Sequence, residues 1–496
     1  MSSRPIDLDV DNKDENQRFG YRPLFSRSIR SLTSLAIGIA VTSVTVAVFS
    51  LFSFLLTTPG PRGIWLWWVA CAGQFLVALI CAQFAAHFPL TGFTYQSASR
   101  LIHPLVGWGF GWLYAILWIV AIIGADFGLA TQVVVPLFNL STSIGMAEVV
   151  CVIVVVLQAA IVILSVQLMK LVNNAAVATE VVGGLLLALV VLLTALFTGH
   201  AHLSNVISTG TADTHGYYNY LGPFMLALLL GIYTISTFEG PSNFAEETVN
   251  PARIVPQAMM RTVIYSSVAG FIVLFAFVWA TPNLARVSSL PAPLPAVIQA
   301  SLGSVWEHIF LVVILVSYFS LGLVCVATGG RVVFAMSRDK RFPGYQAFSK
   351  VSPRFGTPAY ATAFVALAAI IFIVSVARIP TTFENVLSSS ALIITIIYLG
   401  TLIVYLACRP RLPEAHGFNL GRWGLPIAIV ALLWTIFAVL LLSLPAEFRS
   451  GVEWTGILLA SGVVVGAVML VFKRAEMMGR DPGPRVETET ATSTEH

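Results

Sequence analysis

Charged residues are scarce in this sequence. Of its 496 residues, 10% are Asp, Glu, Lys or Arg and 57% are hydrophobic. An ordinary soluble domain has about 25% charged residues, so the composition excludes a chain made of two or three soluble domains. The net charge of +4 is small and gives no reason to expect nucleic acid as a partner.

Several chemical motifs are also missing. The five cysteines lie far apart without CxxC spacing, which is typical of small buried apolar residues rather than of disulfides or metal ligands. No P-loop is present, so ATP does not drive the protein directly. Neither a metal-ligand cluster nor a nucleophile–base pair stands out, and we therefore expect no catalytic residue, no metal and no cofactor. Residues 1–31 have no apolar core, so no cleavable signal peptide is expected.

What the sequence does contain is a series of long apolar blocks. Each has about 20 residues, the length that a helix needs to cross a bilayer, and helices are required because the hydrocarbon region offers no water to the backbone. We predict an all-α polytopic membrane protein with about 12 transmembrane helices in one transporter domain, residues 32–472, between an N-terminal tail, 1–31, and a disordered C-terminal tail, 473–496. The predicted spans are 32–56, 64–88, 108–136, 146–169, 172–198, 221–244, 259–281, 305–335, 358–378, 384–408, 424–445 and 453–472. We expect Asn173 and Asn174, just after Lys170, to separate the fourth span from the fifth.

The positive charges are distributed unevenly between the two sides. If the N-terminus is cytoplasmic, every Lys and Arg falls in an inward segment except Arg62, Arg286, Arg378 and Arg449. Cytoplasmic loops of membrane proteins carry such an excess. The sequence therefore predicts a multi-pass protein of the cell membrane with both termini in the cytoplasm.

Two of the predicted helices contain an interruption. Helix one has Gly38 and a Thr/Ser cluster, and helix six has Gly240-Pro241 in an otherwise helical run, where proline removes a backbone hydrogen bond. We predict a break near residues 40–45 and another near residues 237–243, facing each other at mid-membrane. Glu239 adjoins the second break, and a charge at this depth costs roughly 2.5–3.5 kcal/mol on insertion scales, which makes it a functional candidate.

The positions of the breaks indicate an inverted repeat. Helices one and six lead two five-helix halves, residues 32–198 and 221–408, and run in opposite directions; two extra helices, 424–472, follow. Broken helices in corresponding positions are typical of transporter binding sites. The outer half of helix one offers free N–H groups to a carboxylate, and the outer half of helix six offers free carbonyls to an ammonium.

Four stretches, in order along the chain, resemble the amino acid–polyamine–organocation superfamily, and within it the amino acid/choline permease group. They are Thr58-Pro59-Gly60-Pro61 with Trp65 and Trp67; Pro89-Leu90-Thr91-Gly92-Phe93-Thr94-Tyr95 with Gly111-Trp112; Phe238-Glu239 with Glu246-Glu247-Thr248-Val249-Asn250-Pro251; and Arg331, Ala335, Met336, Arg338 and Asp339 with Pro343. The resemblance covers residues 32–472 and implies a leucine-transporter-type fold.

The sequence departs from the family pattern at several positions. Gln83 replaces a usual acid, Phe93 and Thr237 replace glycines, and Glu180 stands where many relatives have Lys or His. The coupling ion is therefore predicted less well than the fold.

The breaks and the resemblance together give the candidate site residues. Those for the substrate are Ala40, Val41, Thr42, Ser43, Val44, Thr45, Tyr233, Thr237, Phe238, Glu239 and Gly240, with Tyr114 and Tyr318 as weaker candidates. Those for proton coupling are Glu239, Glu180 and Asp126, of which Glu180 and Asp126 can instead be paired structurally with another polar helix. Glu246 and Glu247 are expected to be exposed at the cytoplasmic mouth and to gate it through nearby arginines.

The resulting hypothesis is a secondary active transporter for an amino acid or related amine, coupled to a proton in preference to sodium. A bundle of helices one, two, six and seven would rock against the remaining scaffold in the bilayer. The substrate can be a neutral amino acid, a cationic one, choline or a γ-amino acid. The rival hypotheses are a non-transporting nutrient sensor on the same fold and an integral membrane enzyme.

Overall fold

The computed structural model describes residues 17–198, 202–290, 293–379, 382–413, 417–479 and 481–482. Over these ranges the fold is helical, without a strand, and the one isolated bridge joins Ile29 to Thr248. Eleven helices in the same ranges are long and apolar enough to cross a membrane. Counted with the interrupted sixth segment, they give the predicted twelve, so the all-α polytopic fold is confirmed.

The membrane segments, in chain order, are α2 (Ser31–Thr42) with α3 (Val44–Thr57); α4 (Trp67–His87); α6 (Pro104–Gly128) with η2 (Leu129–Val134) and α7 (Val135–Leu137); α8 (Ile144–Leu164); α9 (Val166–Thr198); α11 (Leu228–Thr234) with η4 (Gly240–Glu247); α12 (Pro251–Trp279); α15 (Ser304–Arg338); α17 (Ala359–Val376); α18 (Thr382–Cys408); α19 (Gly424–Ser443); and α20 (Arg449–Phe472). Shorter helices in the connections include α5 (Thr94–Leu101), α10 (Pro223–Leu226), α13 (Leu284–Ser288), α14 (Pro293–Leu302), α16 (Tyr345–Phe348), η7 (Ala446–Phe448) and α21 (Arg474–Met477).

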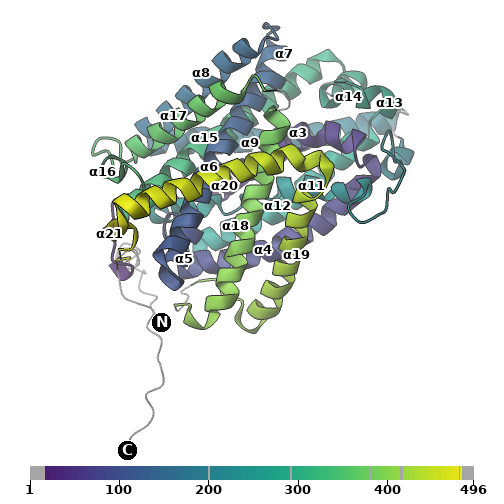
Figure 1. Ribbon diagram of the computed structural model, residues 1–496. Helices are drawn as coiled ribbons and strands as arrows, with labels where there is room; N and C mark the ends of the chain where they lie inside the picture. The colour runs from purple at the N-terminus through teal and green to yellow at the C-terminus, as the bar shows by residue number, and fades with distance from the viewer. Residues whose placement is uncertain are drawn as a thin grey trace, which may run out of the picture.

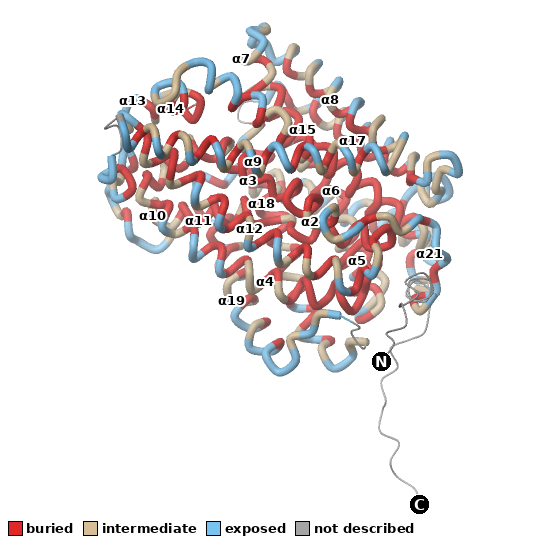
Figure 2. Tube along the Cα trace, turned by 180° about the vertical axis from the view of Figure 1, so that it is seen from behind, coloured by how far each residue is buried: buried red, intermediate tan, exposed pale blue. Residues whose placement is uncertain are grey.

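The described chain begins and ends at the same end of the bundle, beside α5 and α21, whereas α13 and α14 lie at the other end (Figure 1). We call these ends the terminal face and the opposite face. Buried residues fill the centre of the bundle (Figure 2). The outer helices instead expose apolar side chains such as Val156, Ile371, Leu433 and Val463, as expected of surfaces that contact lipid rather than water.

The boundary between the fourth and fifth segments differs from the prediction. The chain breaks at Ser165, which has an extended backbone, and both asparagines lie inside α9. Asn173 accepts a hydrogen bond from Ser320 Oγ at 3.2 Å, and Asn174 Nδ2 donates to Thr33 Oγ1 at 3.1 Å. Each asparagine thus has one hydrogen-bond partner on another helix, and neither residue ends α9.

The first residues after α20 fold back onto the terminal face instead of leaving it. They form α21, and Asp481 accepts hydrogen bonds from Ser99 Oγ at 2.6 Å and from Arg341 at 2.8 Å. The expected disordered tail therefore does not begin at residue 473. Residues 483–496 lie outside the described residues.

Candidate functional site

The first segment is broken where the sequence predicted. Ser43 has φ 22° and ψ 80° and separates α2 from α3. The Thr42 hydroxyl lies 3.1 Å from the carbonyl oxygens of Gly38 and Ile39, so it donates a hydrogen bond to carbonyl groups at the end of α2. Hydroxyls that compete with the backbone in this way favour helix ends over helix interiors.

The second break begins earlier than predicted. Helix α11 ends at Thr234, residues 235–239 are not helical, and η4 starts at Gly240. Pro241 lies in the first turn of η4, where proline is tolerated because its missing N–H would have no partner in any case. Gly240-Pro241 therefore starts the second half of the segment, and Asn243 is already helical.

The two breaks touch each other. Thr237 Oγ1 donates to the Val41 carbonyl oxygen at 3.0 Å, which confirms that the breaks face one another. Thr237 has φ 57° and Phe93 has φ 45°, so both positions where the resembled family has glycine adopt the left-handed conformation. Such a backbone is costly for residues with a side chain, and at Thr237 the hydroxyl bond offsets part of that cost.

We expect Thr237→Ala to lower stability by about 1 kcal/mol, the net worth of a typical hydrogen bond. Thr237→Ser, which keeps the hydroxyl, is the matched control and should stay close to the parent. Thermal unfolding in detergent measures the difference. Equal melting temperatures for the Ala and Ser variants would show that the contact between the breaks does not stabilise the fold.

A small central cavity, of about 60 Å³, lies between the breaks. Its lining includes five predicted substrate residues, Val41, Thr42, Ser43, Tyr233 and Thr237, and the weaker candidate Tyr318. The other six predicted substrate residues (Ala40, Val44, Thr45, Phe238, Glu239 and Gly240) and Tyr114 are not in its lining. The lining also includes residues that were not predicted, among them Trp118 and Gly124 of α6 and Ser390 of α18. A signal was present for two of them, since Gly124 lies two residues before Asp126 and Ser390 ends a run of three serines.

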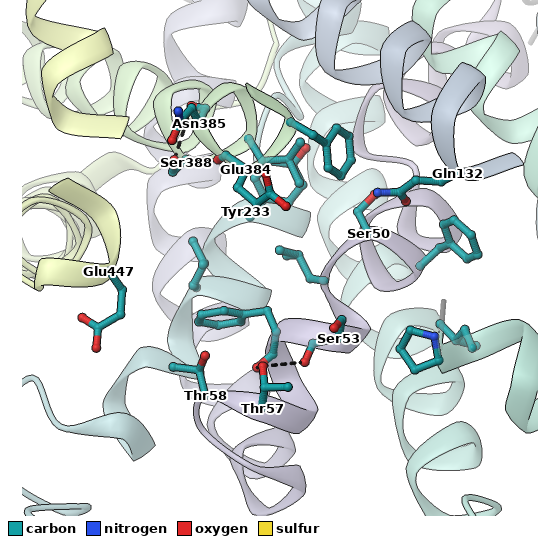
Figure 3. Close-up of a pocket in the computed structure, with 18 of the residues that line it drawn as sticks. Ser50, Ser53, Thr57, Thr58, Gln132, Tyr233, Glu384, Asn385, Ser388 and Glu447 are labelled. Carbon is teal, nitrogen blue, oxygen red and sulfur yellow. Dashed lines mark hydrogen bonds between the residues drawn. The ribbon is translucent and has the colours of Figure 1, made fainter. Parts of the chain in front are cut away.

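An outer cavity, of about 680 Å³, continues from the central one toward the opposite face. The two cavities share Ser50, Tyr233 and Leu387. Figure 3 shows Tyr233 and Ser50 in the outer cavity together with Glu384 of α18 and Glu447 of η7. Since both glutamates are exposed, the shared lining defines a route from the opposite face to the breaks.

Glu239 is fully buried but points away from this route. Tyr398 of α18 donates a hydrogen bond to its Oε2 at 2.5 Å. Phe238 stacks on the same tyrosine ring, with centroids 5.0 Å apart and planes 14° apart. The hydroxyl of Tyr114, on α6, is a second polar group beside the Glu239 carboxyl. Glu239 therefore connects the second break to α18 and lines neither cavity.

Glu180 of α9 lies at the start of α3. Its Oε1 accepts hydrogen bonds from Ser43 Oγ at 3.0 Å and from the Thr45 N–H at 3.2 Å. This N–H belongs to the first turn of α3 and has no partner within the helix. A side chain of the protein thus occupies the helix end that the sequence analysis assigned to a substrate carboxylate.

Asp126 of α6 lies apart from both breaks. Its Oδ1 accepts a hydrogen bond from Gln158 Nε2 of α8 at 2.7 Å, and the same nitrogen is 3.2 Å from the Phe319 carbonyl oxygen. Its neighbours Gly124 and Ala125 line the central cavity, but Asp126 itself does not. The contacts of Asp126 join three helices.

Two ion pairs close the terminal face. Arg331 Nε lies 2.6 Å from Glu247 Oε1, and Arg338 lies 2.8 Å from Glu246 Oε2. The predicted pairing with arginines is confirmed, but the predicted exposure is wrong, since both glutamates are buried. The N-terminal segment covers them: the backbone N–H groups of Ser28 and Ile29 donate to the Glu247 carbonyl oxygen, each at 2.9 Å.

Asp339, just after α15, extends this closure. Its carboxylate accepts hydrogen bonds from Tyr21 at 2.7 Å and from Tyr95 at 2.6 Å. Burial, and then the Asp339 charge, raise the pKa of both tyrosines above their usual range, so both remain donors at neutral pH. The Arg338 guanidinium lies 3.6 Å from the Tyr21 ring centroid, a cation–π contact. Residues before α2 are thus bound to residues after α15.

These features define a class of protein. A helical membrane protein with two facing helix breaks, a cavity that reaches them from one face, and a sealed second face is a membrane transporter.

Comparison with known proteins identifies the family. A profile of the amino acid permease family matches residues 28–470, and the chain belongs to this family. Together with relatives named as permeases, this makes it a transporter of amino acids or amines.

Three relatives illustrate the range of similarity. An uncharacterised amino-acid permease of Schizosaccharomyces pombe is 22% identical over 90% of this chain and 84% of its own length. The amino-acid permease BAT1 of Arabidopsis thaliana is 22% identical over 87% of this chain and 88% of its own. The choline transporter of Saccharomyces cerevisiae is 28% identical over 45% of this chain and 40% of its own.

Proposed function

We propose that the protein is a secondary active transporter that moves an amino acid or amine by alternating access, with the substrate held between the two helix breaks. One observation carries the proposal: a route lined by described residues leads from the opposite face to the breaks, while buried ion pairs seal the terminal face. A fold that is open on one side of its central site and closed on the other is one of the two conformations that alternating access requires.

The ion pairs indicate which parts would move. Glu246 and Glu247 end η4, in the predicted rocking bundle, and Arg331 and Arg338 belong to α15, in the scaffold. Opening of the terminal face would separate these partners, and substrate in the central cavity would then leave. The unequal distribution of Lys and Arg supports placing the terminal face in the cytoplasm, in the cell membrane.

Proton coupling is the second part of the proposal. Glu239 and Glu180 are buried carboxyl groups at the two breaks, where binding or loss of a proton changes the local charge without any other ion. Glu239 is our first candidate because it directly precedes η4 at the second break and its carboxyl group is fully buried. Asp126 is the weakest candidate, since its contacts lead away from the breaks.

The test is uptake into vesicles that contain the purified protein. Lysine, a neutral amino acid, γ-aminobutyrate, choline and cadaverine would each be offered with an inward proton gradient, and we expect at least one to accumulate. Thermal stabilisation by the same compounds measures binding separately, because a ligand that binds only the folded state raises its stability. Stabilisation without uptake would contradict transport and support the sensor hypothesis.

A further inference from the structure

Four helix ends lie at the two breaks, and their polarity differs. Helices α2 and α11 end at the breaks, whereas α3 and η4 begin there. A helix C-terminus carries a partial negative charge and an N-terminus a partial positive charge. An incoming zwitterion would place its ammonium near the first pair of ends and its carboxylate near the second pair.

The positive end of α3 is already occupied by the protein. Glu180 accepts the N–H of Thr45 in the first turn of α3 together with the Ser43 hydroxyl. Glu239 precedes η4, but its side chain makes no capping hydrogen bond there and is directed at Tyr398. A substrate carboxylate would therefore meet the Glu180 carboxylate at the start of α3 instead of a free donor.

The cavity walls add to this asymmetry. The lining of the central cavity contains no charged side chain among the described residues. In the outer cavity, the charged residues of the described lining are Glu384 and Glu447, both acidic and exposed. Among the described residues, neither wall includes a Lys, Arg or His to pair with a substrate carboxylate. Hydroxyls and the rings of Trp118, Tyr233 and Tyr318 can instead accept a cation. Aromatic faces attract ammonium groups.

We propose that the substrate is an organic cation with at least one ammonium group and no carboxylate. This inference rests on the proposed function and narrows its substrate from amino acids or amines to amines. The ammonium lies near the C-terminal ends of α2 and α11, and Glu384 and Glu447 draw cations into the outer cavity by their charge.

Two pairs of compounds test the proposal, because within each pair a single carboxylate is the difference: cadaverine against lysine, and putrescine against ornithine. Thermal stabilisation and competition for uptake would be measured for each. Like charges brought together across an interface cost several kcal/mol, so we expect the carboxylate-free member to bind at least about tenfold more tightly in both pairs.

Glu180→Gln tests the physical cause. The variant keeps an oxygen to cap α3 but loses the negative charge, so lysine should gain at least about tenfold relative to cadaverine. Glu453→Gln is the matched control, since Glu453 is an exposed acid on α20, paired with Arg449, outside both cavity linings. The control should leave the cadaverine-to-lysine ratio at its parental value.

The outcomes separate this inference from the proposed function. If lysine binds and accumulates as well as cadaverine, the inference is overturned while the transporter stands. If folded protein neither binds nor accumulates any member of the two pairs or any other amino acid or amine, both are overturned. A folded Glu180→Gln variant that keeps the parental cadaverine-to-lysine ratio overturns the charge argument. If that variant does not fold, the comparison of the paired compounds on the parent protein decides the question.

Discussion

Glu239→Gln should abolish uptake driven by a proton gradient while leaving the protein folded and inserted. Glutamine has nearly the same size and can still accept the hydrogen bond from Tyr398, but it cannot bind and release a proton. An ionisable group this deep in a membrane segment is costly and is retained for function. We expect initial uptake under an inward proton gradient to fall at least about tenfold, because the variant has no carboxyl group at this position to carry the proton.

Two measurements distinguish a coupling role from a structural one. Exchange of internal for external substrate at equal pH needs no net proton movement, so the variant should retain it. Tyr398→Phe removes the hydrogen bond but keeps the carboxyl group, and it should shift the pH profile of uptake without abolishing uptake. A correctly inserted Glu239→Gln protein with the parental rate and pH profile would eliminate Glu239 as the proton site.

Arg331→Met should open the terminal face. Removal of one member of a buried ion pair leaves the other charge uncompensated and costs about 3–5 kcal/mol, and the Glu247 partner is almost entirely buried. The ion pair forms when the terminal face is closed. Loss of the pair therefore favours the conformation in which the terminal face is open. We expect a lower melting temperature and a terminal face that reagents can enter.

Cys325 provides a reporter for that opening. It lines the central cavity and is buried. In a chain whose other four cysteines are replaced by alanine, a membrane-impermeant thiol reagent added on the terminal side should label Cys325 faster after Arg331→Met. The double variant Arg331→Met/Glu247→Leu removes both charges and should recover part of the lost stability. Unchanged labelling in the single variant would mean that the ion pair does not hold the face closed.

The fold was predictable from the sequence because the bilayer imposes a length and an apolar composition on every crossing. The first break was predictable as well, since Gly38 and the Thr/Ser cluster are local signals. The boundary between α8 and α9 was not. There a serine interrupts the helix, while the more polar Asn173 and Asn174 stay helical, and each forms a hydrogen bond with a side chain on another helix.

The candidate site was predictable only in part. Residues at the breaks themselves, such as Thr42 and Thr237, could be predicted from the local sequence, and they line the central cavity. The direction in which a side chain points could not be predicted from the local sequence. Glu239 points toward Tyr398, and Glu180 contacts α3 from a helix far along the chain. These placements depend on how helices far apart in sequence pack, and a period of 3.6 residues carries no information about that.

The small volume of the central cavity, about 60 Å³, has a kinetic consequence. A cavity needs about 10–15 Å³ to hold one water molecule, so this one has room for a few waters in the empty protein. A substrate that requires the surrounding side chains to separate can bind only the fraction of the empty protein in which they have done so. Apparent affinity is reduced by that fraction, and association is slower than diffusion alone would set. A substitution that enlarges the space beside the breaks would then speed capture without adding any contact to the bound molecule.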